Sequence, residues 1–254
     1  MAQKFIIKAV VQAIRRLPGY PNLKVLDLSC GRGEVLAELL KDGCEVRGTH
    51  YRPDDYKLAG NFKVSDHIPI DGDVDLTKSL QYKDESFDVV ILCEVLEHLH
   101  SHFSVIREAG RILAPGGFLI ITTPNIARIH SRWHFFLTGT HKLIHRRIGW
   151  DVTPDKYYSF HINPVDITVL HTLLYQAGFL VQRLGFTKFK WHYGWWLILY
   201  PLFWLSVRIE IGRRSGNLSW KSGERDLFRW MVKPALLASE QLLLTAKRED
   251  KIAV

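Results

Sequence analysis

A loop with two glycines holds the first residues whose types and spacing suit ligand binding. Residues 25–33 read Val-Leu-Asp-Leu-Ser-Cys-Gly-Arg-Gly, a short apolar strand followed by a turn and a helical sequence. Gly31 and Gly33 let a ligand approach the backbone closely. The expected helix directs free N–H groups into the turn, which suits a carboxylate or phosphate, and Asp27 could bind an ammonium or a hydroxyl. Taken alone, such a turn is shared by nucleotide sites and by plain tight turns.

Two histidines could supply a general base where strands are expected to end. His98 follows the apolar run 87–93, and His161 lies just before the helix start Asn163-Pro164. Imidazole is the usual proton acceptor near neutral pH, and ligands of open α/β sheets bind at the carboxyl ends of strands. His98 could instead cap a helix or support a neighbour, and for His161 a structural and a catalytic role are both open.

Several other chemistries lack their sequence signatures. The chain contains neither a Gly-x-Ser-x-Gly elbow nor a P-loop. Glu94, Glu97 and His98 are metal-ligand types, but one short cluster is too little, so the sequence predicts no metal site. The three cysteines are odd in number and show no Cys-x-x-Cys spacing, and no signal peptide is apparent. A reducing, cytoplasmic setting is therefore expected.

The elements that would position these residues alternate between strands and helices. Short apolar runs predict strands, and apolar residues at helical spacing predict helices, with Ser104 capping the third helix and Pro115-Gly116-Gly117 ending it. The alternation favours an α/β, doubly wound, Rossmann-like sheet in one domain spanning residues 1–254. The strands are expected at 24–28, 45–49, 68–70, 87–93, 118–122, 179–186 and 241–247, and the helices at 3–17, 33–41, 105–113 and 165–177.

Ordered motifs follow the loop along the chain. With Leu26-Asp-Leu-Ser-Cys-Gly-Arg-Gly33, this order resembles the class I S-adenosylmethionine (SAM)-dependent methyltransferases, especially the methyltransferase type 11 subgroup with ubiquinone-biosynthesis O-methyltransferases and polysaccharide-locus enzymes. The resemblance covers roughly residues 20–186 and the final strand, and implies a seven-stranded sheet whose last strand is antiparallel. The motifs are Asp75-Leu76, Asp84-Glu-Ser-Phe-Asp-Val-Val90, Glu94-Val-Leu-Glu-His-Leu99, Leu113-Ala-Pro-Gly-Gly117, Thr123-Pro-Asn125 and Leu174-Tyr-Gln-Ala-Gly-Phe179.

The resemblance implies SAM as the cofactor and gives the loop its role. Gly31 and Gly33 would lie against the methionine part of SAM, and Asp27 would stand near its amino group. Ser29 replaces a glycine of the family pattern in the same loop. Methyl transfer would then proceed by in-line displacement.

The same resemblance places further residues around the rest of SAM. Asp75 would accept the adenine amino group beside the Leu76 backbone. Cys93 and Glu94 would line the methyl-transfer site, and Cys93 is not expected to act as a nucleophile.

The end of the second strand departs from the family pattern. The family usually has Asp or Glu there, whose carboxylate accepts both ribose hydroxyls, but this chain has His50. Because a neutral imidazole offers one acceptor, the ribose would be held less well, or by Asp54 or Asp55. A SAM-binding interaction protein without catalysis is the alternative that this departure leaves open.

An aromatic, basic insertion is expected between the last two strands, at residues 187–236. It holds six of the eight tryptophans, with nine Lys or Arg against three acids, and residues 125–150 hold five Lys or Arg and no acid. Aromatic residues with flanking cations suit the surface of an anionic membrane. A buried lid or a homodimer interface is an equally simple use of aromatics, and single-stranded nucleic acid is a third.

Function follows as an expectation from these features together. The net charge of +8 is concentrated in the two basic segments, which should form a rim around the acceptor pocket. We expect O-methylation of a small-molecule, glycan or lipid-linked anionic acceptor, in the cytoplasm or at the membrane surface. A nucleic-acid substrate is disfavoured because the fourth strand ends in Cys-Glu-Val-Leu, whereas nucleic-acid amino-group methyltransferases have Asn/Asp-Pro-Pro-Tyr there. An RNA methyltransferase is therefore kept only as an alternative.

Overall fold

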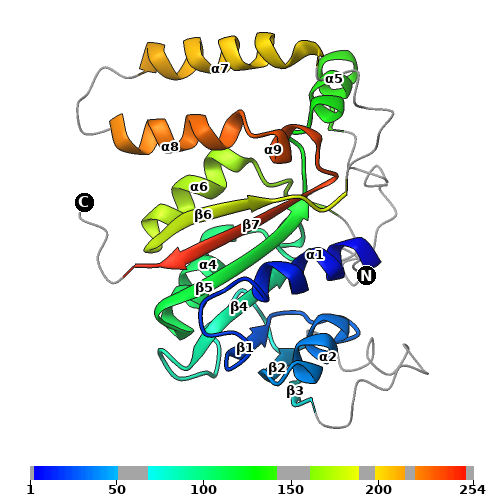
Figure 1. The fold of residues 1–254 in the computed structure, drawn as a ribbon, viewed down its shortest axis with the longest axis vertical. Coiled ribbons are helices and arrows are strands. Elements are labelled where there is room, and N and C mark those ends of the chain that lie inside the picture. Colours follow the sequence, from blue (N-terminus) through cyan, green and yellow to red (C-terminus); the bar gives the residue numbers. More distant parts are fainter. Residues whose placement is uncertain (1–2, 51–67, 142–160, 189–197, 215–220, 250–254) are drawn as a thin grey trace.

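Seven strands form one sheet, in the order β3-β2-β1-β4-β5-β7-β6 (Figure 1). The computed structural model describes residues 3–50, 68–141, 161–188, 198–214 and 221–249. Strands β1 to β5 run parallel, and β7 lies antiparallel between β5 and β6. The expected Rossmann-like α/β sheet with an antiparallel last strand is confirmed. The strands are β1 (Lys24–Asp27), β2 (Glu45–Thr49), β3 (Ile70–Asp71), β4 (Phe87–Cys93), β5 (Leu113–Pro124), β6 (Phe179–Gly185) and β7 (Gln241–Arg248).

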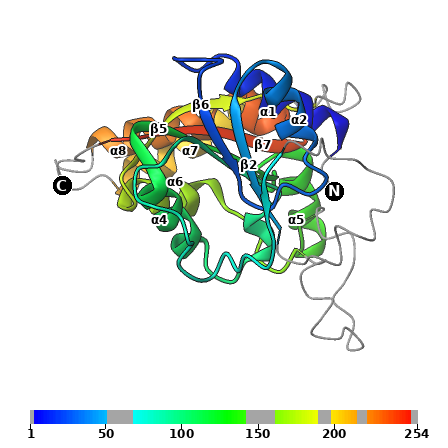
Figure 2. The same ribbon diagram turned by 90° about the horizontal axis from the view of Figure 1, so that it is seen from below.

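Helices cover both faces of the sheet (Figure 2). On one face lie α1 (Lys4–Ile14) and α2 (Glu34–Lys41), and on the other lie α4 (His102–Ile112) and α6 (Ile167–Gln176). The side chains of β4 alternate between two cores: Val89 and Ile91 join one cluster, while Val90 and Leu92 join the other. Burial on both faces explains why this strand is an unbroken apolar run.

The first helix, expected at residues 3–17, packs on the sheet as α1. Its residues Ile6, Val10 and Ile14 are fully buried against the core. Burying three such side chains contributes several kcal/mol of apolar transfer free energy, at roughly 1.5–3 kcal/mol for each. That contribution fixes α1 as part of the domain core.

Local rules misplaced boundaries of α4 and α6. α6 begins at Ile167 after its cap Asp166, later than the expected start at Asn163-Pro164. α4 begins at His102, and its cap is Ser101, whose side chain accepts a hydrogen bond from the Ser104 backbone N–H. The expected cap at Ser104 is therefore wrong by one turn, because two serines three residues apart both suit the position. Pro115-Gly116-Gly117 lies inside β5, which starts directly after α4 because Leu113 pairs with Phe87 of β4.

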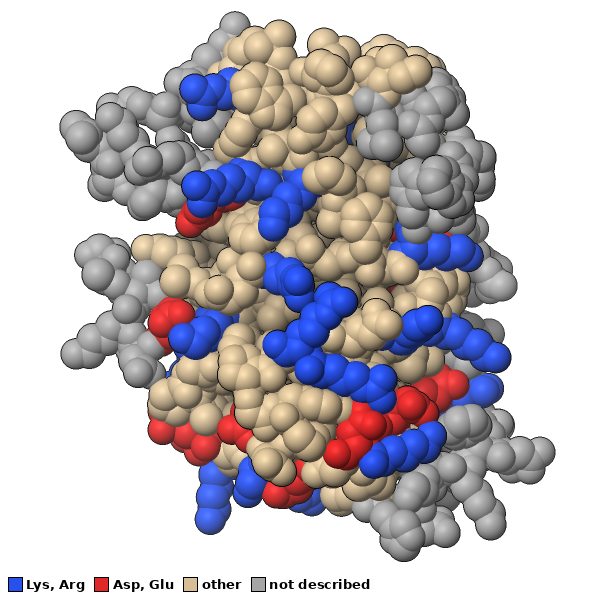
Figure 3. Space-filling model, in the orientation of Figure 1, with Lys and Arg blue, Asp and Glu red and all other residues tan. Residues whose placement is uncertain are grey.

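A helical layer follows β6 along the chain. It consists of α7 (Tyr200–Arg214), α8 (Lys221–Met231) and α9 (Pro234–Ala238), beside α5 (Ile129–Thr138), which follows β5. Few charged side chains lie over α7 and α5 in the space-filling view (Figure 3). None of the described helices is long and apolar enough to cross a membrane.

The two ends of this layer are held together at the sheet. The Thr187 backbone N–H donates to the Ser239 hydroxyl over 3.0 Å, and the Gln241 backbone N–H donates to the Thr187 hydroxyl over 3.1 Å. The Asn125 side-chain amide donates to the Leu236 and Ser239 carbonyls over 2.6 and 3.0 Å. These bonds form a neck that ties the helical layer to the end of β5.

We expect Gly48→Ala to destabilise the protein by about 1–3 kcal/mol. A Cβ at Gly48 would lie 2.7 Å from Cys30 Sγ and 2.9 Å from Leu36 Cδ1. Urea unfolding followed by circular dichroism measures the loss. As the control, Cys30→Ala added to Gly48→Ala removes the sulfur and should recover part of it. An unchanged midpoint for Gly48→Ala alone would contradict this account of the packing.

Candidate functional site

The glycine loop after β1 is built for close backbone approach. Ser29, Gly31 and Gly33 all adopt positive φ angles of 73°, 56° and 69°. The loop is anchored to β2, because the Ser29 and Cys30 N–H groups donate to the side-chain and backbone oxygens of Thr49. A Cβ built at Gly31 would meet no described atom within 4 Å. Open space therefore lies beside the loop at the N-terminus of α2.

Asp27 supplies a buried acceptor at the same place. Its side chain is 1% exposed, and its Oδ1 atom has no hydrogen-bond partner among the described residues. Burial raises the pKa of this carboxyl to about 7. A buried acceptor without a donor is costly unless a ligand satisfies it, and an ammonium group does so best. Asp27 and the open loop thus fit the amino and carboxylate groups of SAM.

Cys93 and Glu94 end β4 next to this loop. The Thr122 hydroxyl of β5 donates to Cys93 Sγ over 3.3 Å. The hydroxyl and carbonyl oxygens of Thr122 both accept from the Glu94 backbone N–H. Burial raises the pKa of the Cys93 thiol well above its ordinary range, so this thiol is unsuited to nucleophilic attack. Glu94 has a positive φ of 56°, which is costly for a residue with a side chain and is typical of functional positions.

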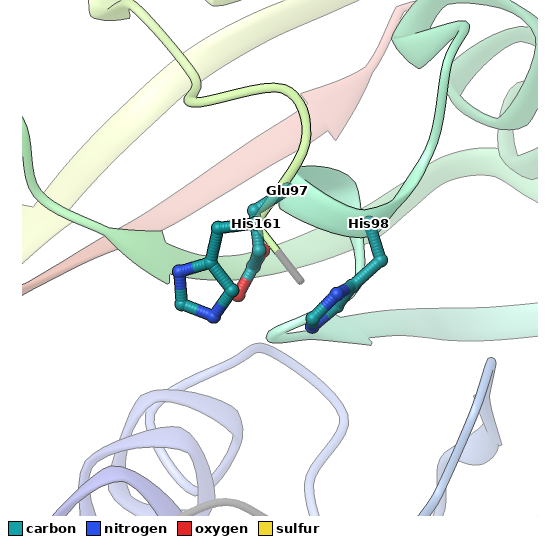
Figure 4. A group of neighbouring side chains, drawn as sticks. All are labelled: Glu97, His98 and His161. Atoms are coloured by element: carbon teal, nitrogen blue, oxygen red, sulfur yellow. The ribbon is translucent and has the colours of Figure 1, made fainter. Parts of the chain in front are cut away.

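The structure brings His98 and His161 together (Figure 4). His98 lies in the short helix η1 (Leu96–His98) after β4, and the ring centroids of the two histidines are 5.1 Å apart in an edge-to-face arrangement. Ligand atoms of both rings and of the Glu97 carboxylate lie within 4.8 Å of one another. Two histidines 63 positions apart thus form one cluster with a buried acid, a grouping that also has the residue types of a metal site.

Contacts that no local pattern signals hold this cluster in place. The Thr123 hydroxyl donates to Glu97 Oε2 over 3.0 Å, and burial raises the pKa of Glu97. The Asn163 N–H donates to the Glu97 carbonyl, and its side-chain amide donates to the carbonyls of Leu99 and His100. Sequence reasoning missed Glu97 and Asn163 as supports of the site, although the Glu-x-x-Glu-His spacing from Glu94 was a signal.

His50, the residue in place of the family carboxylate, directly follows β2. Its backbone N–H donates to the Asp71 carbonyl over 2.8 Å, and its carbonyl accepts from the Val74 N–H over 3.1 Å. The Asp71 carboxylate is engaged by Arg47 through two hydrogen bonds of 2.8 and 3.1 Å. That nearby carboxylate is therefore committed to an ion pair, while Asp54 and Asp55 lie outside the described residues.

The expected adenine residues lie in the turn after β3. Asp75 Oδ1 accepts from the Thr77 backbone and hydroxyl over 2.9 and 2.7 Å, and these bonds lower the pKa of Asp75. Leu76 is buried in the core beneath that turn. Asp75 is thus held as an ionised acceptor on a fixed turn, and its contact with adenine stays a prediction.

Comparisons with known proteins agree with this arrangement. Residues 26–121 match the family model of the methyltransferase domain. The ubiquinone biosynthesis O-methyltransferase of Cereibacter sphaeroides is 27% identical over 162 residues, 58% of this chain and 63% of that protein. The corresponding protein of Xanthomonas campestris pv. campestris is 30% identical over 106 residues, 41% of this chain and 44% of that protein. The matched segments span less than two thirds of these relatives.

Solved structures show the same fold over nearly the whole chain. A SAM-dependent methyltransferase from Archaeoglobus fulgidus superposes with a TM-score of 0.57 at 18% identity, covering 97% of this chain and 95% of that one. At this identity the likeness concerns the fold. The domain match, the glycine loop and the sheet order agree with one another, so residues 26–121 of this chain are similar to the methyltransferase domain family.

Proposed function

We propose that this protein transfers a methyl group from SAM to an oxygen atom of a small-molecule, glycan or lipid-linked acceptor. The observation that carries the proposal is the pairing of His98 with His161 beside the end of β4. Oxygen nucleophiles need a proton acceptor near neutral pH, and imidazole provides one. The distant similarity to O-methyltransferases supports the same choice of acceptor atom.

The chain's own residues would hold the cofactor at the loop and at the turn after β3. Asp27 would accept from the ammonium group, Gly31 and Gly33 would leave room for the carboxylate, and Asp75 would accept from the adenine amino group. His50 would face the ribose. When bound, SAM supplies an electrophilic methyl carbon on a sulfonium, so the protein's contribution is positioning, exclusion of water and proton transfer.

Proton transfer falls to the histidine cluster. One imidazole would take the proton of the acceptor hydroxyl, while Asn163 and Glu97 keep the two histidine segments in place. Burial favours the neutral form of Glu97, because it raises the pKa of that carboxyl. Glu97 is therefore a positioning residue in this scheme, and His98 and His161 are the candidates for the catalytic base.

Turnover with labelled methyl groups tests the proposal. The full chain is incubated with SAM carrying a labelled methyl group and with fractionated lipid and glycan extracts, and the labelled product is identified by mass spectrometry. We expect a product methylated on oxygen, and far less of it with Asp27→Asn at SAM concentrations near the wild-type dissociation constant, because this variant is designed to weaken cofactor binding. SAM binding without turnover on any fraction would favour the silent binding protein, and label on a base of added RNA would favour an RNA substrate.

A further inference from the structure

Helix α7 has two apolar faces, and only one of them is packed. Tyr200, Phe203 and Val207 recur at helical spacing on the packed face. Tyr200 and Phe203 pack beside the buried pair Ile129 and Leu237, and the Tyr200 hydroxyl donates to the Val232 carbonyl over 2.9 Å. Val207 is buried as well. This face attaches α7 to α5, α8 and α9.

The opposite face of α7 carries a second apolar stripe. Ile198, just before the helix, and Leu202, Leu205 and Ile209 within it recur at spacings of four, three and four residues. They therefore lie on one side of the helix, turned away from the packed face. Their exposed fractions are 79%, 61%, 50% and 44%. Four large aliphatic side chains in one row are more than the scattered apolar residues of an ordinary surface.

α5 adds a second exposed apolar group beside the first. Trp133, Phe136 and Leu137 lie on one side of α5, with Trp133 and Phe136 stacked at a centroid distance of 5.6 Å. The two helices touch through the cluster around Ile129, and Arg132 lies 5.5 Å from the Phe203 ring of α7. Helices α5 and α7 lie at one end of the molecule (Figure 1), so their exposed aliphatic and aromatic residues belong to that end.

The sequence of the helical layer carries a surplus of positive charge, which favours a negatively charged partner. Residues 198–210 and 226–233 hold Arg208, Arg229 and Lys233 against Glu210 and Asp226, and the sequence of residues 211–225 adds four Lys or Arg against one acid. Helix α7 itself ends in Arg213-Arg214. Apolar and aromatic side chains with a surplus of cations match the interface of a bilayer with anionic headgroups, where the apolar groups enter the acyl boundary and the cations meet the phosphates.

We propose that the exposed faces of α5 and α7 dock this protein on an anionic membrane surface. α5 follows β5 directly, and β5 ends beside the strand ends that carry the candidate active site. Docking would therefore bring the acceptor side of the site to the bilayer. The proposal deepens the proposed function by favouring a lipid-linked acceptor, but membrane binding itself is measured without any turnover.

Vesicle co-sedimentation of the full chain tests the docking surface. The probe is vesicles of phosphatidylcholine with phosphatidylglycerol, compared with vesicles of phosphatidylcholine alone. We expect binding to the anionic vesicles, weaker binding at high salt, and a loss of about tenfold or more in affinity for the variant Leu202→Gln with Leu205→Gln and Ile209→Gln. The matched control changes three exposed apolar residues elsewhere, Val169→Gln, Tyr175→Gln and Leu180→Gln, and should bind as the wild type does.

The outcomes separate the membrane from the other occupants of this surface. Equal melting temperatures of the two triple variants show that lost binding is not lost folding. A wild type that ignores anionic vesicles overturns the proposal. The proposal is also overturned if the wild type does not bind vesicles and is a dimer in analytical ultracentrifugation, while the triple variant of α7 is a monomer. A second copy of the chain would then cover the stripe. Vesicle binding is measured without turnover, and a protein that does not bind vesicles could still methylate a water-soluble acceptor. Failure of the docking proposal is therefore distinguishable from failure of the proposed function.

Discussion

Replacing Asp27 by Asn is expected to weaken SAM binding about 100-fold and, at about pH 8, to stabilise the protein without ligand. The loss of affinity follows because the variant removes a charge-assisted hydrogen bond to the ammonium group. Such bonds contribute up to roughly 3 kcal/mol, and about 1.4 kcal/mol corresponds to a tenfold change. Isothermal titration calorimetry measures the dissociation constant directly.

The stabilisation has a defined pH dependence. Burial raises the pKa of Asp27 to about 7 in the folded protein, against about 3.9 in an unfolded chain. The folded state therefore holds the proton more tightly, and the stability that the wild type has below about pH 4 falls as the pH rises towards 7. Asn has no proton to lose. The advantage of Asp27→Asn should grow across this range to at most about 4 kcal/mol, reduced by the unpaired amide N–H groups that Asn brings.

Urea unfolding at about pH 5 and pH 8 checks this result, with exposed Asp73→Asn as the matched control. The wild type should also bind SAM about tenfold more weakly for each pH unit below 7, since the neutral acid cannot pair with the ammonium. If Asp27→Asn keeps wild-type affinity for SAM, or loses stability equally at both pH values, Asp27 is a structural residue and the cofactor lies elsewhere.

The kcat values of His161→Ala and His98→Ala are expected to show which of the two histidines is the general base. General-base catalysis contributes roughly 10²–10⁴-fold, so the variant that lacks the base should lose about 100-fold or more in kcat. The other should lose less. SAM affinity should stay at the wild-type value for both, because neither histidine belongs to the cofactor loop. Added imidazole that restores part of the turnover identifies the base.

The close grouping of Glu97, His98 and His161 gives this experiment a second arm. Turnover of the wild type in a chelator should be unchanged if the cluster transfers a proton. Activity that disappears with the chelator and returns with a divalent cation would replace the general base by a bound metal. If both His→Ala variants keep the wild-type turnover, the cluster takes no part in the reaction.

The sequence predicted those elements whose local pattern and tertiary environment agree. β4 was placed at its observed bounds, Phe87–Cys93, because burial on both faces makes it continuously apolar. The glycine loop after β1 was predicted because Gly31 and Gly33 stand between an apolar strand and a helix, and both adopt positive φ angles. In both cases the residues next to one another in the sequence are enough to indicate the local structure.

Other features depend on residues far apart in the chain. α5 was not predicted, because its Trp133, Phe136 and Leu137 face outward and leave no core-facing period. The Thr123–Glu97 and Asn163–Leu99 bonds join segments 26 and 64 positions apart, which no spacing rule connects. The sequence could therefore name His98 and His161, but it could not show that they meet.

The neck formed by Thr187, Ser239 and Gln241 has a consequence for how such a protein diversifies. The chain leaves the sheet at Thr187 and returns to it at Ser239 and Gln241, and these residues are hydrogen-bonded to one another. A structural change in α7 is therefore expected to stay within the helical layer. Substitutions on the outer stripe of α7 are thereby insulated from Asp27 and from the histidine cluster. Selection could then adapt the proposed docking surface to another lipid composition without changing the residues proposed for methyl transfer.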